Sequence, residues 1–130
     1  MRKFAIAFAA GAALLAGPAL QAKPRLTADQ RLDKLLEGRV AGEPRSCISD
    51  IASDNMQIID GKALVYGRGK TIWVNVPRNA DSLDDDDILV IRKLGGQLCR
   101  LDMITTHDRT SGFYTGFLAL GDFVPYRKAG

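Results

Sequence analysis

The sequence predicts a mostly β domain: a small antiparallel meander or half-open barrel of five to six strands with one short N-terminal helix. Short alternating or apolar runs recur after residue 45, and glycine-rich or aspartate-rich turns separate them. No helical pattern lies between these runs, which argues against a βαβ arrangement. We therefore divide the chain into a signal peptide over 1–22, a leader with the helix over 23–44, and a β domain over 45–130.

The first 22 residues have the three-part layout of a secretory signal peptide. Met1-Arg2-Lys3 is a basic start, Phe4 to Leu15 is uncharged and apolar, and Ala22 is a small residue before a polar stretch. The apolar run is shorter than the roughly 20 residues of a membrane-spanning helix, although an uncleaved anchor is the alternative. We expect Sec-type export, cleavage after Ala22, and a periplasmic or secreted protein with no stable membrane span after cleavage.

Composition limits the partners of the mature chain, which has roughly 108 residues and is long enough for one domain. Two of the 18 basic residues and none of the 15 acidic residues lie in the signal peptide, so the rest carries a formal charge of +1. Generic nucleic-acid binding needs clustered Lys and Arg, and a membrane surface attracts polybasic segments. We therefore expect no nucleic-acid partner.

The leader contains a helix with a recognisable start and end. Thr27 and Gln30 have the spacing of a capping box, and three leucines follow at helical intervals from Leu32 to Leu36. Gly38 is a typical C-terminal stop. We expect a helix over 28–37 and a linker over 40–44.

The β domain is predicted from alternation and turn residues. Asp60-Gly61 is a two-residue hairpin signal, and Pro77 ends a strand because it cannot donate to a ladder. Gly95-Gly96 marks another turn. The expected strands are Met56–Ile59, Ala63–Tyr66, Thr71–Val76, the continuous apolar run Ile88–Ile91, Gln97–Thr105, and an aromatic-rich stretch from Phe113 to Tyr126 that closes the sheet.

The two cysteines, Cys47 and Cys99, both lie in the mature chain. In an oxidising compartment they are expected to form one disulfide, with two separate buried thiols as the alternative. Alternation along the predicted strand places Cys99 on the core face with Leu101 and Met103.

Four features are candidate sites, and each has a plain structural alternative. The run Asp84-Asp85-Asp86-Asp87 offers oxygen ligands for a cation, but four consecutive aspartates cannot converge, which favours a solvated loop. Gly67-Arg68-Gly69-Lys70 lacks phosphate-loop spacing and indicates a hairpin turn. One histidine argues against a catalytic zinc site, so no metal is expected.

The two remaining candidates are aromatic or titratable. His107 precedes Asp108, and such a pair could form a general base, although no nucleophile is marked and a loop residue is the alternative. Tyr66 and Trp73 lie on strands joined by a short turn. They could form a platform for a sugar or a peptide, or pack in the core.

Short motifs spread over the mature chain resemble those of a domain-of-unknown-function family of small exported proteobacterial proteins. The motifs are Arg45–Ile48, the hairpin at Asp60-Gly61, Gly96–Cys99 with Asp102–Ile104, and Leu120–Tyr126, within a region from Arg45 to Lys128. The resemblance implies four cysteines, of which the second, near 77–80, and the fourth, just before Leu120, are missing here. If those two pair in the family, Cys47 is left with Cys99. The family implies no activity.

We expect a non-catalytic periplasmic binding or structural module, with an envelope protein or glycan as partner and no cofactor. A proteinaceous inhibitor or protective factor against an envelope-directed hydrolase is the alternative, and a small hydrolase that uses His107 and nearby carboxylates is third. The candidate binding residues are Tyr66, Trp73, Asp84, Asp85, Asp86, Asp87 and His107.

Overall fold

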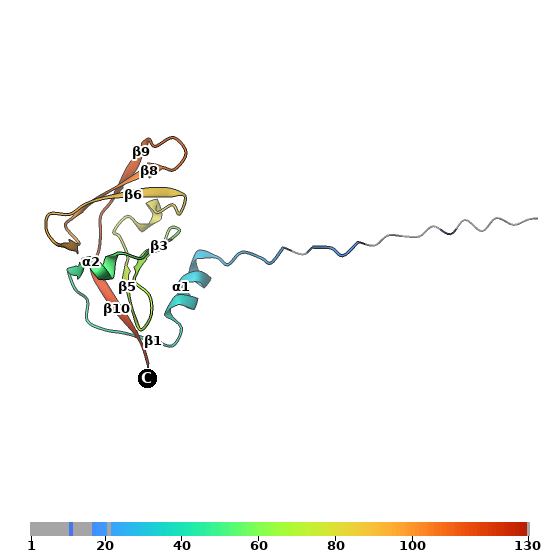
Figure 1. Ribbon diagram of the computed structural model, residues 1–130, viewed down its shortest axis with the longest axis horizontal. Coiled ribbons are helices and arrows are strands. Elements are labelled where there is room, and N and C mark those ends of the chain that lie inside the picture. The colour runs from blue at the N-terminus through green and yellow to red at the C-terminus, as the bar shows by residue number, and fades with distance from the viewer. Residues whose placement is uncertain (1–10, 12–16, 21, 130) are drawn as a thin grey trace, which may run out of the picture.

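The computed structural model describes residues 11, 17–20 and 22–129, and this part of the chain is mostly β (Figure 1). The predicted fold class is confirmed, since every strand pair is antiparallel and no sheet closes into a barrel. The strands are shorter and more numerous than expected. They are β1 (Arg39–Ala41), β2 (Cys47–Ser49), β3 (Met56–Ile59), β4 (Ala63–Tyr66), β5 (Thr71–Asn75), β6 (Asp87–Arg92), β7 (Gln97–Cys99), β8 (Met103–Asp108), β9 (Tyr114–Leu118) and β10 (Phe123–Lys128). The helices are α1 (Ala28–Leu36), α2 (Asp50–Ser53) and the 3₁₀ turn η1 (Ala80–Ser82).

A five-stranded sheet in the order β1-β10-β5-β4-β3 organises the molecule because it is covered on both faces. The central core lies on one face, and the helix-side core lies on the other. The central core consists of Ile48, Leu64, Tyr66, Leu83, Leu98, Ile104, Leu118, Leu120 and Phe123, and the helix-side core of Ile59, Ala63, Val65, Ile72 and Val74. Successive residues of a strand point to opposite faces, so all four residues of β4 are buried.

The helix α1 closes the helix-side core as its sequence predicts. The Thr27 hydroxyl accepts from the Gln30 backbone N–H, and the Gln30 side chain accepts from the Thr27 N–H, which completes the capping box. Leu32, Leu35 and Leu36 pack against the sheet and are half-buried. The helix ends before Gly38, whose φ of 69° is one that L side chains rarely adopt.

The expected linker over 40–44 is in part a strand. Residues 39–41 form β1, which pairs with β10 at the edge of the sheet. The sequence pattern missed it because Val40 is exposed and its neighbours give no alternation. The hairpin at Asp60-Gly61 is confirmed, but its loop has three residues, since Ile59 pairs with Ala63.

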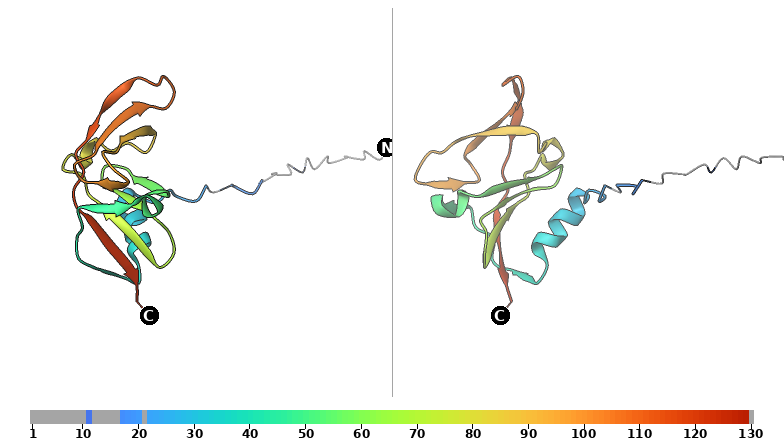
Figure 2. Two further views of the ribbon diagram at one scale, coloured as in Figure 1. Left: turned by 60° about the vertical axis from the view of Figure 1, so that its left-hand side comes forward. Right: turned by 45° about the vertical axis from the view of Figure 1, so that its right-hand side comes forward.

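A three-stranded sheet in the order β6-β8-β9 covers the central core at the end of the molecule opposite the C-terminus (Figure 2). A two-stranded sheet of β2 and β7 lies beside it. The predicted strand Gln97–Thr105 is two strands, because a turn at 100–102 separates β7 from β8. The alternation therefore breaks, and Leu101 and Met103 are exposed instead of facing the core.

No helix in the described part of the chain is long and apolar enough to cross a membrane. The predicted signal peptide over 1–22 lies for the most part outside the described residues.

Candidate functional site

Both faces of the three-stranded sheet carry apolar side chains. One face packs against the central core, and the other is exposed. Side chains directly opposite each other on paired strands lie on the same face. Leu89, Ile104, Thr106 and Leu118 face the central core. The opposite face, called the outer face below, carries Ile88, Val90, Met103, Tyr114 and Phe117, which are between 42% and 61% exposed.

His107 lies among the aromatic residues of the outer face. Its ring packs edge-on against Tyr114, with ring centroids 5.9 Å apart. Nδ1 lies 3.3 Å from the Gly112 carbonyl, which can only accept, so we assign the ring proton to Nδ1. Nε2 then accepts from the Thr105 hydroxyl at 3.0 Å. Both ring nitrogens are thus bonded within the protein.

Asp108 does not orient His107, because adjacent strand residues point to opposite faces. Its Oδ1 instead accepts from the backbone N–H groups of Thr110 and Ser111 and from the Ser111 hydroxyl, at 2.7–3.0 Å. These bonds, those of Ser111 foremost, lower the pKa of the Asp108 carboxyl. The carboxylate therefore orders the turn between β8 and β9 and does not pair with His107, which lies on β8 and not in a loop.

Asp84, Asp85 and Asp86 lie in an exposed turn before β6, and Asp87 is the half-buried first residue of β6. Asp85 pairs with Arg31 at 3.3 Å, Asp84 accepts from the Asp86 N–H, and Asp87 accepts from the Thr115 hydroxyl. Carboxylate oxygens of Asp60, Asp84 and Asp85 lie within 4.8 Å of one another. All three residues are exposed, and Arg31 already supplies a cation, so the geometry matches the solvated loop better than a metal centre.

The aromatic platform does not form, because Tyr66 lies inside the central core. Its ring packs edge-on against Phe123 at 5.8 Å, and its burial raises the pKa of the hydroxyl far above the ordinary value. The buried hydroxyl has no hydrogen-bond partner among the described residues. Trp73 pairs with Tyr66 across the strands and packs half-buried against the same core. Neither ring is presented as a flat exposed surface.

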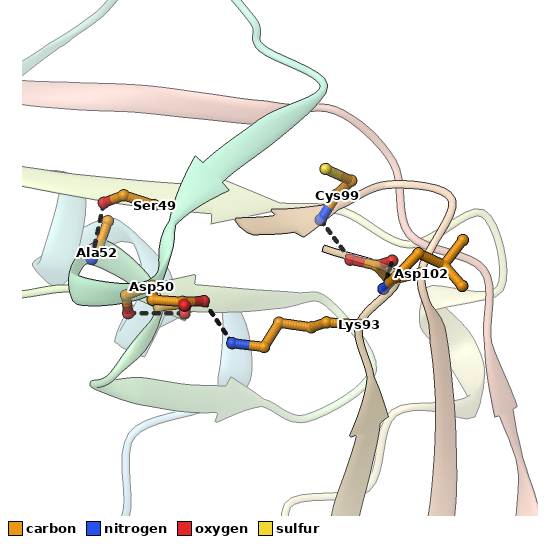
Figure 3. Close-up of polar contacts among 8 residues, drawn as sticks. Ser49, Asp50, Ala52, Lys93, Cys99 and Asp102 are labelled. Carbon is orange, nitrogen blue, oxygen red and sulfur yellow. Dashed lines mark hydrogen bonds and ion pairs between the residues drawn. The ribbon is translucent and has the colours of Figure 1, made fainter. Parts of the chain in front are cut away.

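Cys47 and Cys99 form the predicted disulfide, directly opposite each other in the β2–β7 pair. A cavity of about 440 Å³ lies beside it, between the two cysteines and the loop Leu94–Gln97. Figure 3 shows Asp102 next to Cys99, and the Asp102 carboxylate accepts from the Cys99 backbone N–H at 2.7 Å. The same view shows Lys93 paired with Asp50.

Asp102 also accepts from the Leu94 N–H at 3.1 Å and is only 6% exposed. It holds the loop beside the disulfide closed. The alternation that places Cys99 on the core face would put Asp102 on the opposite face of one continuous strand, because nothing in the residue pattern marks the turn at 100–102.

The outer face was only partly found from the sequence. His107 is a candidate from the sequence, and Phe117, Tyr114 and Val90 are predicted in strands without a face, but the alternation wrongly places Met103 on the core face. The continuous apolar run Ile88–Ile91 predicts a strand but does not say which of its faces is covered. The exposure of one face follows only from the way that the sheets pack.

Comparison with protein-family models, with curated proteins and with solved structures finds no match for this chain. The resemblance to a family of exported proteins therefore stays a prediction from its motifs.

Proposed function

We propose that the mature chain is a non-catalytic binding module of the bacterial envelope and that its outer face contacts a protein partner. The observation that supports this most is the exposure of five large apolar side chains on one face of a three-stranded sheet. Contiguous exposed apolar surface of this kind is uncommon on monomers and often marks an interaction site.

The composition of the outer face also fits a protein interface. Tyr, Phe and Met are enriched at the centre of interfaces, whereas Lys, Asp and Glu are depleted there. The outer face has Tyr114, Phe117 and Met103, with His107 and Thr105 as the polar groups among them. Arg92, opposite Met103, is the charged residue at its margin.

The contacts of His107 favour binding over general-base catalysis. A general base needs a free nitrogen within hydrogen-bond reach of its substrate, and a carboxylate usually orients the ring. Here Thr105 and Gly112 occupy both nitrogens, and Asp108 bonds to the turn. The ring is held rigid by its neighbours, as is useful in a contact surface.

An envelope location is supported by the basic and apolar start of the chain and by the disulfide, because disulfides persist in oxidising compartments. Membership of the family of exported proteins is part of the proposal and rests on the motifs quoted above.

An inhibitor of an envelope-directed hydrolase is the second candidate, and one observation favours it. The turn between β8 and β9 protrudes at the end of the molecule (Figure 1), and Phe113 in it is 75% exposed. The Asp108 carboxylate and the Gly112 carbonyl hold this turn in one conformation. A rigid protruding loop with an exposed aromatic residue would suit insertion into a cleft.

The test compares crosslinking pull-downs of the tagged protein exported in its native host. Val90→Thr combined with Phe117→Ser should reduce recovery of the partner at least tenfold, because both side chains are exposed on the outer face. Ile51→Ser is the matched control, since Ile51 is an exposed apolar residue on α2.

Three results would separate the candidates. Equal recovery with the double variant and with Ile51→Ser would contradict the proposed surface. Loss of the partner with Phe113→Ser alone would favour the inhibitor. A partner that resists proteolysis but is removed by glycosidases would show that the ligand is a glycan.

A further inference from the structure

The two larger sheets leave an open seam between them. The five-stranded sheet ends at β3, the three-stranded sheet ends at β6, and neither edge has a strand partner among the described residues. Both edges border one cavity of about 510 Å³, called the seam below, which is lined by Met56–Ile58 of β3 and Asp87–Leu89 of β6. Figure 2 shows β6 next to β3 on this side of the molecule.

The hydrogen-bond pattern shows which backbone groups of β3 face the seam. In an antiparallel pair, residues alternate between bonding their partner and pointing away from it. The Gly67 N–H donates to the Asn55 carbonyl at 2.7 Å, which sets the phase of the β3–β4 ladder. The N–H and C=O groups of Met56 and Ile58 therefore point out of the sheet into the seam.

The same reasoning applies to β6. The Asp108 N–H donates to the Phe113 carbonyl, and the Asp108 carbonyl accepts from the Gly112 N–H, so both backbone groups of Asp108 point toward β9. The backbone groups of Asp87, which lies opposite Asp108 on β6, therefore point away from β8. The protein satisfies Asp87 itself, since its N–H donates to Asp84 and its C=O accepts from Arg109. The backbone N–H and C=O groups of Leu89, two residues further along, also point away from β8. They have no such partner among the described residues.

The floor of the seam is apolar and its rims are charged. Met56, Ile58 and Leu89 pack against the central core, so their side chains share one side of the two strands. The charged residues around the opening are Arg109 and the ion pair of Arg31 with Asp85. A strand added here would turn every second side chain toward the central core.

We propose that the seam binds an extended polypeptide segment by strand addition, with apolar side chains at alternate positions facing the central core. Unpaired N–H and C=O groups at two-residue intervals are complementary to another extended backbone. The apolar floor selects the side chains that face inward. This site shares Ile88 with the outer face, but it binds through the backbone groups of Met56, Ile58 and Leu89, so either proposal can fail without the other.

The experiment uses a phage-displayed library of random ten-residue peptides, selected on the oxidised mature protein. The enriched peptides are expected to share apolar residues at every second position. A synthetic copy of the best peptide should slow hydrogen exchange at the amides of Met56, Ile58 and Leu89. The amides of Val90 and Gln57, already bonded in the ladders, are internal controls.

The matched control is the same peptide methylated on alternate backbone nitrogens. Methylation of the nitrogens that face one strand edge should weaken binding at least tenfold, because each loses a backbone donor. Equal binding by the methylated peptide would overturn the proposal, as would the absence of any enriched peptide or protection confined to β8 and β9. Protection of the same amides by self-association without peptide would assign the seam to a second copy and would equally overturn it.

Discussion

Removal of the disulfide is the perturbation whose magnitude follows most directly from the structure. Cys47 and Cys99 are separated by 52 residues in sequence. In the chain-entropy model a loop of this length corresponds to about 4 kcal/mol of stabilisation at 25 °C. That is a large share of the 5–15 kcal/mol by which a domain of this size is stable. Cys47→Ala with Cys99→Ala should lose about this much.

The position of the Cys47–Cys99 disulfide in the fold supports a loss of the full value of about 4 kcal/mol. β2 and β7 have three residues each and, among the described residues, pair only with each other, so the disulfide fixes a very short sheet. Ile48 and Leu98, the neighbours of the two cysteines, are buried in the central core. Loosening of this pair therefore also exposes core side chains.

The assay is urea denaturation of the oxidised protein and of the double variant, followed by circular dichroism. With a urea m-value of about 1–3 kcal/mol/M, the midpoint should fall by roughly 1.3–4 M. A loss below about 1 kcal/mol at an unchanged m-value would refute the reasoning. It would mean that β2 and β7 stay paired without the bond or that the unfolded chain is already compact.

Three further variants test the interior and the β8–β9 turn. Tyr66→Phe should raise the free energy of unfolding by about 1 kcal/mol, because it removes a buried hydroxyl without a partner; a loss of stability in urea denaturation would contradict this. Asn75→Ala should cost about 2–4 kcal/mol, because the Asn75 side chain bonds both the N–H and the C=O of Gly121; a thermal melt that shifts by less than about 4 °C would contradict this. Asp108→Asn should disorder the turn at neutral pH. Since the folded pKa of Asp108 is lowered, its stabilising effect is present above the unfolded pKa of about 3.9 and is lost as pH falls through the folded pKa. A protection factor of the Ser111 amide, taken relative to the intrinsic exchange rate at each pH, that stays unchanged from pH 7 to pH 2 would contradict this.

The elements predicted well are those that depend on local chemistry. The capping box at Thr27 and Gln30, the turn at Gly61 and the strand end at Pro77 each follow from one or two residues. The Cys47–Cys99 bond needed only the count of cysteines and an oxidising compartment. None of these predictions required knowledge of which elements pack together.

The features that could not be predicted depend on the packing of the sheets. Tyr66 looked available for binding because it lies next to a turn, but β4 is covered on both faces. The run Ile88–Ile91 predicts a strand, but of its four residues Leu89 is half-buried and the other three are exposed. A pattern of apolar residues identifies a strand without saying what lies over each face, and this distinction decides where the candidate site is.

The most direct measurement places a photo-crosslinking phenylalanine analogue at position 117 of the exported protein in its native host. Our account predicts one crosslinked protein partner of constant mass with the analogue at Phe117 and none with the analogue at Ile51, although both side chains are exposed. The same pattern of products from both positions, or no product from position 117, would contradict the proposal that the outer face is the binding surface.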